Sequence, residues 1–139
     1  NKDGNTINKY LSDLKLKLSF MDYFIPVFTS AVTGKRLTEV IEKVNLAYNN
    51  ANKRITTGNL NELLSSAILS NEPPYRNGKK LKIQYITQVQ VAPPTFILFV
   101  NDATLMHFSY LRYLENRFRD AVDFSGTPIK FITRSKEEN

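Results

Sequence analysis

The 139-residue sequence predicts an α/β piece in residues 1–53, followed by an α+β unit in residues 54–139. An alternating apolar stretch at 81–91 and a continuously apolar stretch at 95–100 are typical of two neighbouring strands. Helical spacing of apolar residues precedes and follows this pair. The first piece contains a single candidate strand, which has no partner there. We therefore expect the other strands of that sheet to precede Asn1.

The first piece reads helix, strand, helix. Apolar residues recur at intervals of three and four along residues 6–18, which predicts a helix. The short apolar run at 25–29 predicts a strand, and Pro26 is tolerated near a strand's start. After Gly34, residues 37–51 again have helical spacing of apolar side chains and predict a second amphipathic helix.

The second unit reads helix, strand, strand, helix, strand. Thr57 is the expected N-cap of its first helix, which ends before Asn71. In the strand at 81–91, we expect every second residue from Leu81 to Val91 to form the apolar face and the intervening residues a mostly polar face. Residues 95–100 are apolar on both faces, which indicates a strand covered at least partly on both sides.

The remaining elements follow the same rules. A short helical turn is expected around residues 104–106, and Ser109 is the expected cap of a longer helix. The turn at 125–127 leads into a last strand at 129–133. The second unit is therefore a three-stranded sheet with helices packed on it.

Composition excludes several classes of function. There is no cysteine, which excludes disulfides and thiolate metal sites and fits a cytoplasmic location. No apolar run approaches the roughly 20 residues that a membrane-spanning helix needs. The net charge of +6 makes a polyanionic partner plausible without identifying it.

The turn at residues 30–34 has two interpretations. Small residues are common in an ordinary connection between a strand and a helix. The same position, at the carboxyl end of a strand, is also where open α/β sheets bind ligands. Spacing alone leaves both interpretations open.

Longer literal runs point to one family. Residues 30–37 resemble the guanine-contacting turn of translation-factor-class GTPases. The rest resembles the C-terminal domain of the bacterial double GTPases called Der or EngA. The residues that carry this resemblance are Pro73, Pro74, Gly78, Lys79, Leu81, Tyr85, Gln88, residues 92–96, Val100, Asn101, residues 108–116 and residues 124–129.

The resemblance implies that residues 1–53 are the C-terminal remnant of a second GTPase domain and that residues 54–139 are a KH-like domain. It implies a role in large ribosomal subunit biogenesis, with the KH-like domain making nucleotide-dependent contacts to the upstream GTPase domains and to the ribosome or its RNA. GTP or GDP with Mg²⁺ would be bound by the intact protein. The guanine loop would include Ser30, Ala31 and Val32.

Two motifs that such functions commonly use are absent from the sequence. A GTPase needs a GxxxxGK[ST] loop to hold the phosphates, and none is present, so we expect this chain to be inactive alone and to bind no cofactor. Asn1–Lys2–Asp3–Gly4 also places its aspartate one position early for the guanine-reading NKxD motif. The GxxG loop of RNA-binding KH domains is missing too, as it is from the family that this chain resembles.

A basic surface remains as the candidate contact to RNA or the ribosome. Its members are Arg76, Lys79, Lys80, Lys82, Lys130 and Arg134. These side chains either contact phosphates or form a solvated edge that discourages strand addition. Two alternatives to a GTPase-linked role stay open, namely an independent RNA-binding module and a protein-interaction module.

The sequence offers no candidate for a catalytic site, a metal site or a base-stacking surface. His107 is the single histidine, so neither a histidine dyad nor a histidine metal cluster can form. Ser109 has no paired base and is better explained as a helix cap. The aromatic residues follow strand and helix periodicity, which favours the core over base stacking. We expect no catalytic residue and no metal site in this chain.

Overall fold

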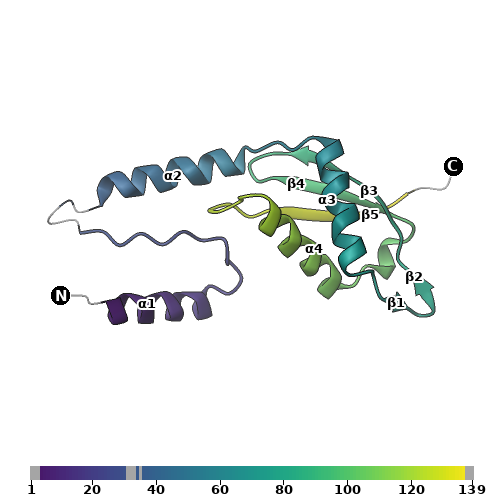
Figure 1. The fold of residues 1–139 in the computed structure, drawn as a ribbon, viewed down its shortest axis with the longest axis horizontal. Helices are drawn as coiled ribbons and strands as arrows, with labels where there is room; N and C mark the ends of the chain where they lie inside the picture. Colours follow the sequence, from purple (N-terminus) through teal and green to yellow (C-terminus); the bar gives the residue numbers. More distant parts are fainter. Residues whose placement is uncertain (1–3, 31–33, 35, 137–139) are drawn as a thin grey trace.

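The computed structural model describes residues 4–30, 34 and 36–136 of the chain. In these described residues, four helices, a one-turn 3₁₀ helix and five strands follow one another (Figure 1). Their bounds are α1 Gly4–Lys17, α2 Leu37–Ala51, α3 Thr57–Ser70, β1 Tyr75–Arg76, β2 Lys79–Lys80, β3 Ile83–Gln90, β4 Thr95–Val100, η1 Ala103–Leu105, α4 Phe108–Ala121 and β5 Lys130–Ser135. Within the described ranges, no helix is long and apolar enough to cross a membrane.

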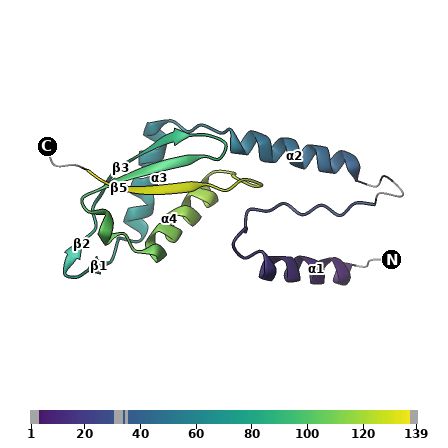
Figure 2. The same cartoon turned by 180° about the vertical axis from the view of Figure 1, so that it is seen from behind.

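The main sheet has the strand order β3–β4–β5. β3 and β4 are antiparallel neighbours, and β4 and β5 are parallel. The two views show α3 and α4 on one face of this sheet (Figures 1 and 2). The predicted α+β unit with a three-stranded sheet is therefore confirmed, and a small hairpin of β1 and β2 is added to it.

The core lies between the sheet and these two helices. Phe96 of β4 is fully buried, and its ring lies 6.0 Å from that of Phe118 in α4 and 5.3 Å from that of Phe131 in β5. From α3, Leu60 and Leu64 complete the same cluster. Burial of a large apolar side chain contributes about 1.5–3 kcal/mol. The aromatic residues on this face are thus core residues, as their periodicity predicted.

The prediction for the two faces of β3 was wrong after Ile83. Ile83 pairs with Val100, but Tyr85 already pairs with Phe99, so Gln84 is an extra residue in the ladder. Such a bulge exchanges the faces of the side chains from Tyr85 to Gln88, because strand side chains alternate with a period of two, and a second register shift follows between Gln88 and Gln90. Leu81 is buried before the bulge, whereas Ile86 and Gln88 are buried after it.

Two helix caps also differ from the prediction. Thr56, not Thr57, caps α3, and its hydroxyl oxygen accepts a hydrogen bond of 3.3 Å from the Asn59 amide. At α4, the ring nitrogen Nδ1 of His107 accepts a hydrogen bond of 3.1 Å from the amide of Ser109. Ser109 therefore lies inside the helix that it was expected to cap. The 3₁₀ turn at Ala103–Leu105 agrees with the expected helical turn.

The predicted strand at residues 25–29 does not form. Figure 1 shows this segment as an irregular extended stretch between α1 and α2. A strand needs a neighbour for its amides, and no strand of the described chain lies beside it. α2 has a stripe of apolar side chains that are more than half exposed, as expected of a helix without its packing partner. They are Leu37, Ile41, Val44 and Tyr48.

Candidate functional site

Arg76, Lys79, Lys82 and Arg134, four of the six predicted basic residues, lie at the same end of the sheet, and Lys80 lies there too. Arg76 and Lys79 pair within the small β1–β2 hairpin. The guanidinium of Arg76 donates to the carbonyl oxygen of Thr104 at 3.3 Å, which holds the hairpin beside η1. Lys82 immediately precedes β3, and Arg134 pairs with Phe99 at the far end of β4. The fold thus brings these four residues to the end of the sheet where β4 and β5 have their carboxyl ends.

The position of Lys82 is fixed through its backbone. The Asn101 side-chain oxygen accepts a hydrogen bond of 2.9 Å from the amide of Lys82, and the Asn101 amide donates back to the Lys82 carbonyl at 3.0 Å. The side-chain nitrogen of Asn101 also donates to the Lys80 carbonyl at 3.1 Å. The Lys82 side chain is left exposed, so its charge faces solvent at a defined place.

The other two predicted basic residues, Lys80 and Lys130, differ from these four in their ion pairing or in their position. Lys80 forms an ion pair of 2.9 Å with Glu72, and that hydrogen bond and charge raise the pKa of the ammonium group. Part of its charge is therefore neutralised locally. Lys130 begins β5, four residues before Arg134, which corresponds to about 13 Å along a strand. It lies at the opposite end of the sheet from the hairpin.

An acidic residue borders the basic group. Asp102 accepts hydrogen bonds from the hydroxyl and the amide of Thr104, and these bonds lower the pKa of its carboxyl group, with a smaller contribution from the charge of Lys79. The carboxylate therefore stays charged at neutral pH next to Lys79. The basic end of the sheet is consequently less positive than the count of lysines and arginines alone indicates.

The second face of the main sheet lacks a covering element in the described chain (Figure 2). The rings of Tyr85 and Phe99 stack on it with their centroids 4.4 Å apart and their planes at 18°. Ile97 lies beside Ile132 in the ladder, and Tyr85 and Ile132 are 40% and 41% exposed. We call the face that carries these four residues the open face. An apolar sheet face of this kind is typical of a docking surface.

Only a part of the predicted guanine loop is described. Ser30 is partly buried at the end of the extended segment, whereas Ala31 and Val32 lie outside the described residues, as do Asn1, Lys2 and Asp3. Beyond them, Gly34 has a φ of 65° and Arg36, at the N-cap of α2, has a φ of 64°. The chain therefore turns sharply here and enters α2 directly.

The carboxyl-terminal end of α2 packs against the second unit. The side-chain nitrogen of Asn50, itself buried, donates to the Ser125 carbonyl at 2.9 Å. The amide of Ala92 donates to the Ala51 carbonyl at 2.7 Å. Gly126 has a φ of 81°, and a Cβ atom added to it would lie 2.6 Å from the Cβ of Ala47. We call this contact between α2 and the loop at residues 123–127 the α2 junction.

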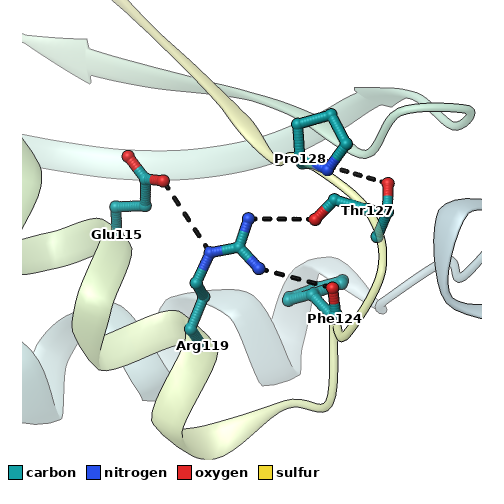
Figure 3. A network of polar contacts seen from close by, with 5 residues as sticks. All are labelled: Glu115, Arg119, Phe124, Thr127 and Pro128. Atoms are coloured by element: carbon teal, nitrogen blue, oxygen red, sulfur yellow. Dashed lines mark hydrogen bonds and ion pairs between the residues drawn. The ribbon is translucent and has the colours of Figure 1, made fainter. Parts of the chain in front are cut away.

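Two further polar residues hold the junction. The buried side chain of Gln88 accepts from the Ile55 amide at 2.8 Å and donates to the Lys53 carbonyl at 2.9 Å, which fixes the link between α2 and α3. Arg119 of α4 donates to the carbonyl oxygens of Phe124 and Thr127 at 3.3 and 3.0 Å (Figure 3). The loop is therefore held from α2 and from α4 at once.

The environment of Arg119 extends to the N-terminal piece. Its guanidinium carbon lies 5.0 Å from the centre of the Tyr23 ring, and its Nε lies 3.8 Å from a carboxylate oxygen of Glu115. Burial raises the pKa of Glu115, and the nearby charge of Arg119 works in the opposite direction. One arginine thus contacts α4, the loop and the segment before α2.

The sequence did not indicate these junction residues as functional. Asn50 and Arg119 fall on helices where polar side chains usually face solvent, and Gly126 read as an ordinary turn residue. No local pattern marks these residues, because their contacts join parts of the chain that are far apart in the sequence. Asn50 and Ser125, for example, are 75 residues apart. In the part of the chain that the structure describes, no three histidine, cysteine or acidic side chains gather as a metal site.

Comparison with known proteins gives a consistent picture. Residues 54–134 match a family described as the KH-domain-like of EngA bacterial GTPase enzymes, C-terminal. Over 138 residues, the chain is 49% identical to the GTPase Der of Agathobacter rectalis. It is 50% identical over 135 residues to that of Alkaliphilus oremlandii and 49% identical over 137 residues to that of Clostridium botulinum. These matches cover 97–99% of this chain and 31% of each relative.

Proposed function

The chain belongs to the Der (EngA) family of bacterial GTPases and corresponds to its C-terminal part. From this we propose that its two parts have different roles. Residues 54–139 are the KH-like domain, and residues 1–53 are the end of the second GTPase domain. The chain spans about a third of the length of the relatives that it matches, so GTP, GDP and Mg²⁺ are bound mainly by other parts of the intact protein.

The observation that carries this proposal is the α2 junction. In sequence, α2 follows the proposed guanine loop at Ser30, Ala31 and Val32, and it ends on the KH-like domain at Asn50 and Ala51. A helix transmits a rigid-body displacement along its length, because its backbone hydrogen bonds resist stretching and bending. A change at the guanine loop therefore moves the KH-like domain as a unit.

The exposed stripe of α2 supports the assignment of the first piece. Four large apolar residues on one side of a helix would cost stability if water covered them permanently. The relatives are about three times as long as this chain. The occupant is the remainder of the second GTPase domain.

The open face is a second contact to the upstream domains. Tyr85, Phe99 and Ile132 present an apolar surface next to the charged Arg134. In the intact protein, this surface docks on a GTPase domain, and nucleotide exchange there covers or uncovers it. The nucleotide bound by the GTPase domain thus determines whether the open face is exposed.

The basic end of the sheet makes the ribosomal contact. Arg76, Lys79, Lys82 and Arg134 lie together, and each exposed cation near a phosphate strengthens binding by releasing counterions. Lys80 contributes less because Glu72 neutralises it, and Lys130 lies too far away to join the same contact. The partner is the large ribosomal subunit and its RNA, and the place of action is the cytoplasm.

The test uses the intact protein and purified large ribosomal subunits in a salt series. The double variant Lys79→Glu and Lys82→Glu should weaken binding strongly at low salt and reduce the salt dependence. The matched control reverses Lys9 and Lys15 on α1, which changes the net charge equally but far from the hairpin. Equal loss in both variants would mean that only total charge matters, and no loss in either would refute the contact.

A further inference from the structure

The two edges of the main sheet differ in how their backbones are occupied. β3 and β5 are the edge strands of the described sheet. At the β3 edge, the side-chain amide of Asn61 accepts from the Ile86 amide at 3.1 Å and donates to the Ile86 carbonyl at 3.1 Å. This one side chain fills the place that a neighbouring strand would take. Asn61 therefore blocks the pairing of an added strand with Ile86, in the middle of β3.

The β5 edge has no such block. The Lys130 amide donates to the Pro94 carbonyl at 2.9 Å, and the Lys136 amide donates to the Val100 carbonyl at 3.0 Å. Strand amides alternate in direction, so residues 130, 132, 134 and 136 direct their backbone groups to β4. The backbone groups of Phe131 and Thr133 point away from β4. Their amides donate no hydrogen bond to another described residue.

The charges along β5 select what can bind there. Lys130, Arg134 and Lys136 are exposed, and no ion pair holds them among the described residues. On the open face, Lys130 and Arg134 flank Ile132, and on the helix face Phe131 and Thr133 are partly exposed. An added strand would therefore meet positive charge, then an apolar side chain, then positive charge again.

We propose that the free edge of β5 is an acceptor for an extended acidic segment of a partner protein, which adds to the sheet as a fourth strand. Its backbone pairs with the outward groups of Phe131 and Thr133, and its alternate acidic side chains lie beside Lys130 and Arg134. The proposal uses the β5 edge and not the β1–β2 hairpin, and it shares only Arg134 with the proposed ribosomal contact.

The same charges disfavour the other occupants. A second copy of this chain would place Lys130 and Arg134 opposite the same residues, and like charges across a strand pair are destabilising. A neutral strand gains the backbone hydrogen bonds only, while an acidic strand also gains the charge pairs. Lysine on an edge therefore acts against general aggregation and in favour of one class of partner.

The probe is a capped hexapeptide of alternating glutamate and valine, titrated into the 139-residue chain. Binding should slow amide exchange at Phe131 and Thr133 and leave Ile132 unchanged, since the Ile132 amide already faces β4. The double variant Lys130→Glu and Arg134→Glu should bind roughly tenfold more weakly. A peptide of alternating lysine and valine and an N-methylated acidic peptide should not bind.

Two substitutions at one position separate the backbone contribution from side-chain effects. Thr133→Pro removes the outward N–H without removing a hydrogen bond to β4, and should abolish binding, whereas Thr133→Val keeps the N–H and should bind as the parent chain does. If circular dichroism shows that the proline variant is unfolded, the N-methylated peptide tests the backbone contribution instead. Unprotected Phe131 and Thr133 amides in the peptide complex would overturn the proposal, and so would preferential binding of a uridine homopolymer at Lys130 and Arg134.

Discussion

The amide of Gly126 donates a hydrogen bond of 2.7 Å to the carbonyl oxygen of Tyr23, so the turn after α4 is joined directly to the segment before α2. Residues 103 positions apart are thereby fixed to one another at the α2 junction. The same glycine closely approaches Ala47 of α2. The N-terminal piece and the KH-like domain therefore share one contact region around a single backbone position.

Replacement of Gly126 by alanine should destabilise the chain by about 2 kcal/mol or more, because φ is 81° and the new Cβ would lie 2.6 Å from the Cβ of Ala47. Chemical denaturation measures the change. The matched control is Gly58→Ala in α3, where a Cβ meets no atom within 4 Å. This control should be neutral or stabilising, since alanine favours helices. Similar losses in both variants would contradict the close contact.

Replacement of Arg119 by lysine should cost about 1.5–3 kcal/mol, because a lysine cannot donate to the Phe124 and Thr127 carbonyls at once. Arg117→Lys is the control, as its guanidinium makes one exposed contact of 3.4 Å to Ser70. The unfolding free energies of the two variants are compared under the same conditions. If the two substitutions cost the same, the loop does not depend on the guanidinium fork.

Replacement of Gln88 by leucine should destabilise the chain by about 1–3 kcal/mol, because the Ile55 amide and the Lys53 carbonyl lose their partner in a partly buried place. Gln84→Leu, at the exposed bulge residue of β3, is the control and should change stability little. Faster amide exchange at Ile55 in the Gln88 variant alone would locate the effect. A neutral Gln88 variant would show that these hydrogen bonds contribute nothing net.

The pH dependence of stability should contain a contribution from Tyr110. Burial raises the pKa of its phenol to about 12 from an ordinary value of 10.0. Above pH 10 the unfolded chain loses this proton while the folded chain keeps it, so the stabilising contribution is complete below pH 10 and is lost as the pH rises towards 12. The slope is at most about 1.4 kcal/mol per pH unit.

The variant Tyr110→Phe removes this titration together with the hydrogen bond of 2.8 Å to the Asn71 carbonyl. It should be less stable at neutral pH, and the difference from the parent chain should shrink between pH 10 and pH 12. Thermal unfolding of both chains across this range makes the comparison. A constant difference across the range would contradict a raised pKa.

Local patterns predicted the elements well, because helical and strand spacing act over a few residues. The order of α3, β3, β4, α4 and β5 could be predicted, and α2 was placed at its observed residues, but the β1–β2 hairpin was missed. The cap of α3 was wrong by one position, since Thr56 and Thr57 are adjacent and chemically alike. His107 could not be foreseen as a cap, because a ring nitrogen is an unusual acceptor for that place.

The predictions that were wrong depend on contacts between residues that are far apart in the sequence. The bulge at Gln84 leaves no mark in the alternating sequence, yet it exchanges the faces of the β3 side chains from Tyr85 to Gln88. The apolar run at residues 25–29 has strand composition but no neighbouring strand in the described chain. Of the candidate site, the grouping of Lys79 with Lys82 followed from sequence proximity, whereas the approach of Arg134 depends on the parallel pairing of β5 with β4.

The central claim is that nucleotide binding elsewhere in the intact protein governs access to the open face of the KH-like domain. Hydroxyl-radical footprinting of Tyr85, Phe99 and Ile132 tests it most directly, with the intact protein bound to GDP or to a non-hydrolysable GTP analogue and with the 139-residue chain as the exposed reference. We expect strong protection of all three side chains in one nucleotide state and reactivity close to that of the reference in the other. Equal reactivity of these side chains in both states and in the isolated chain would contradict the account.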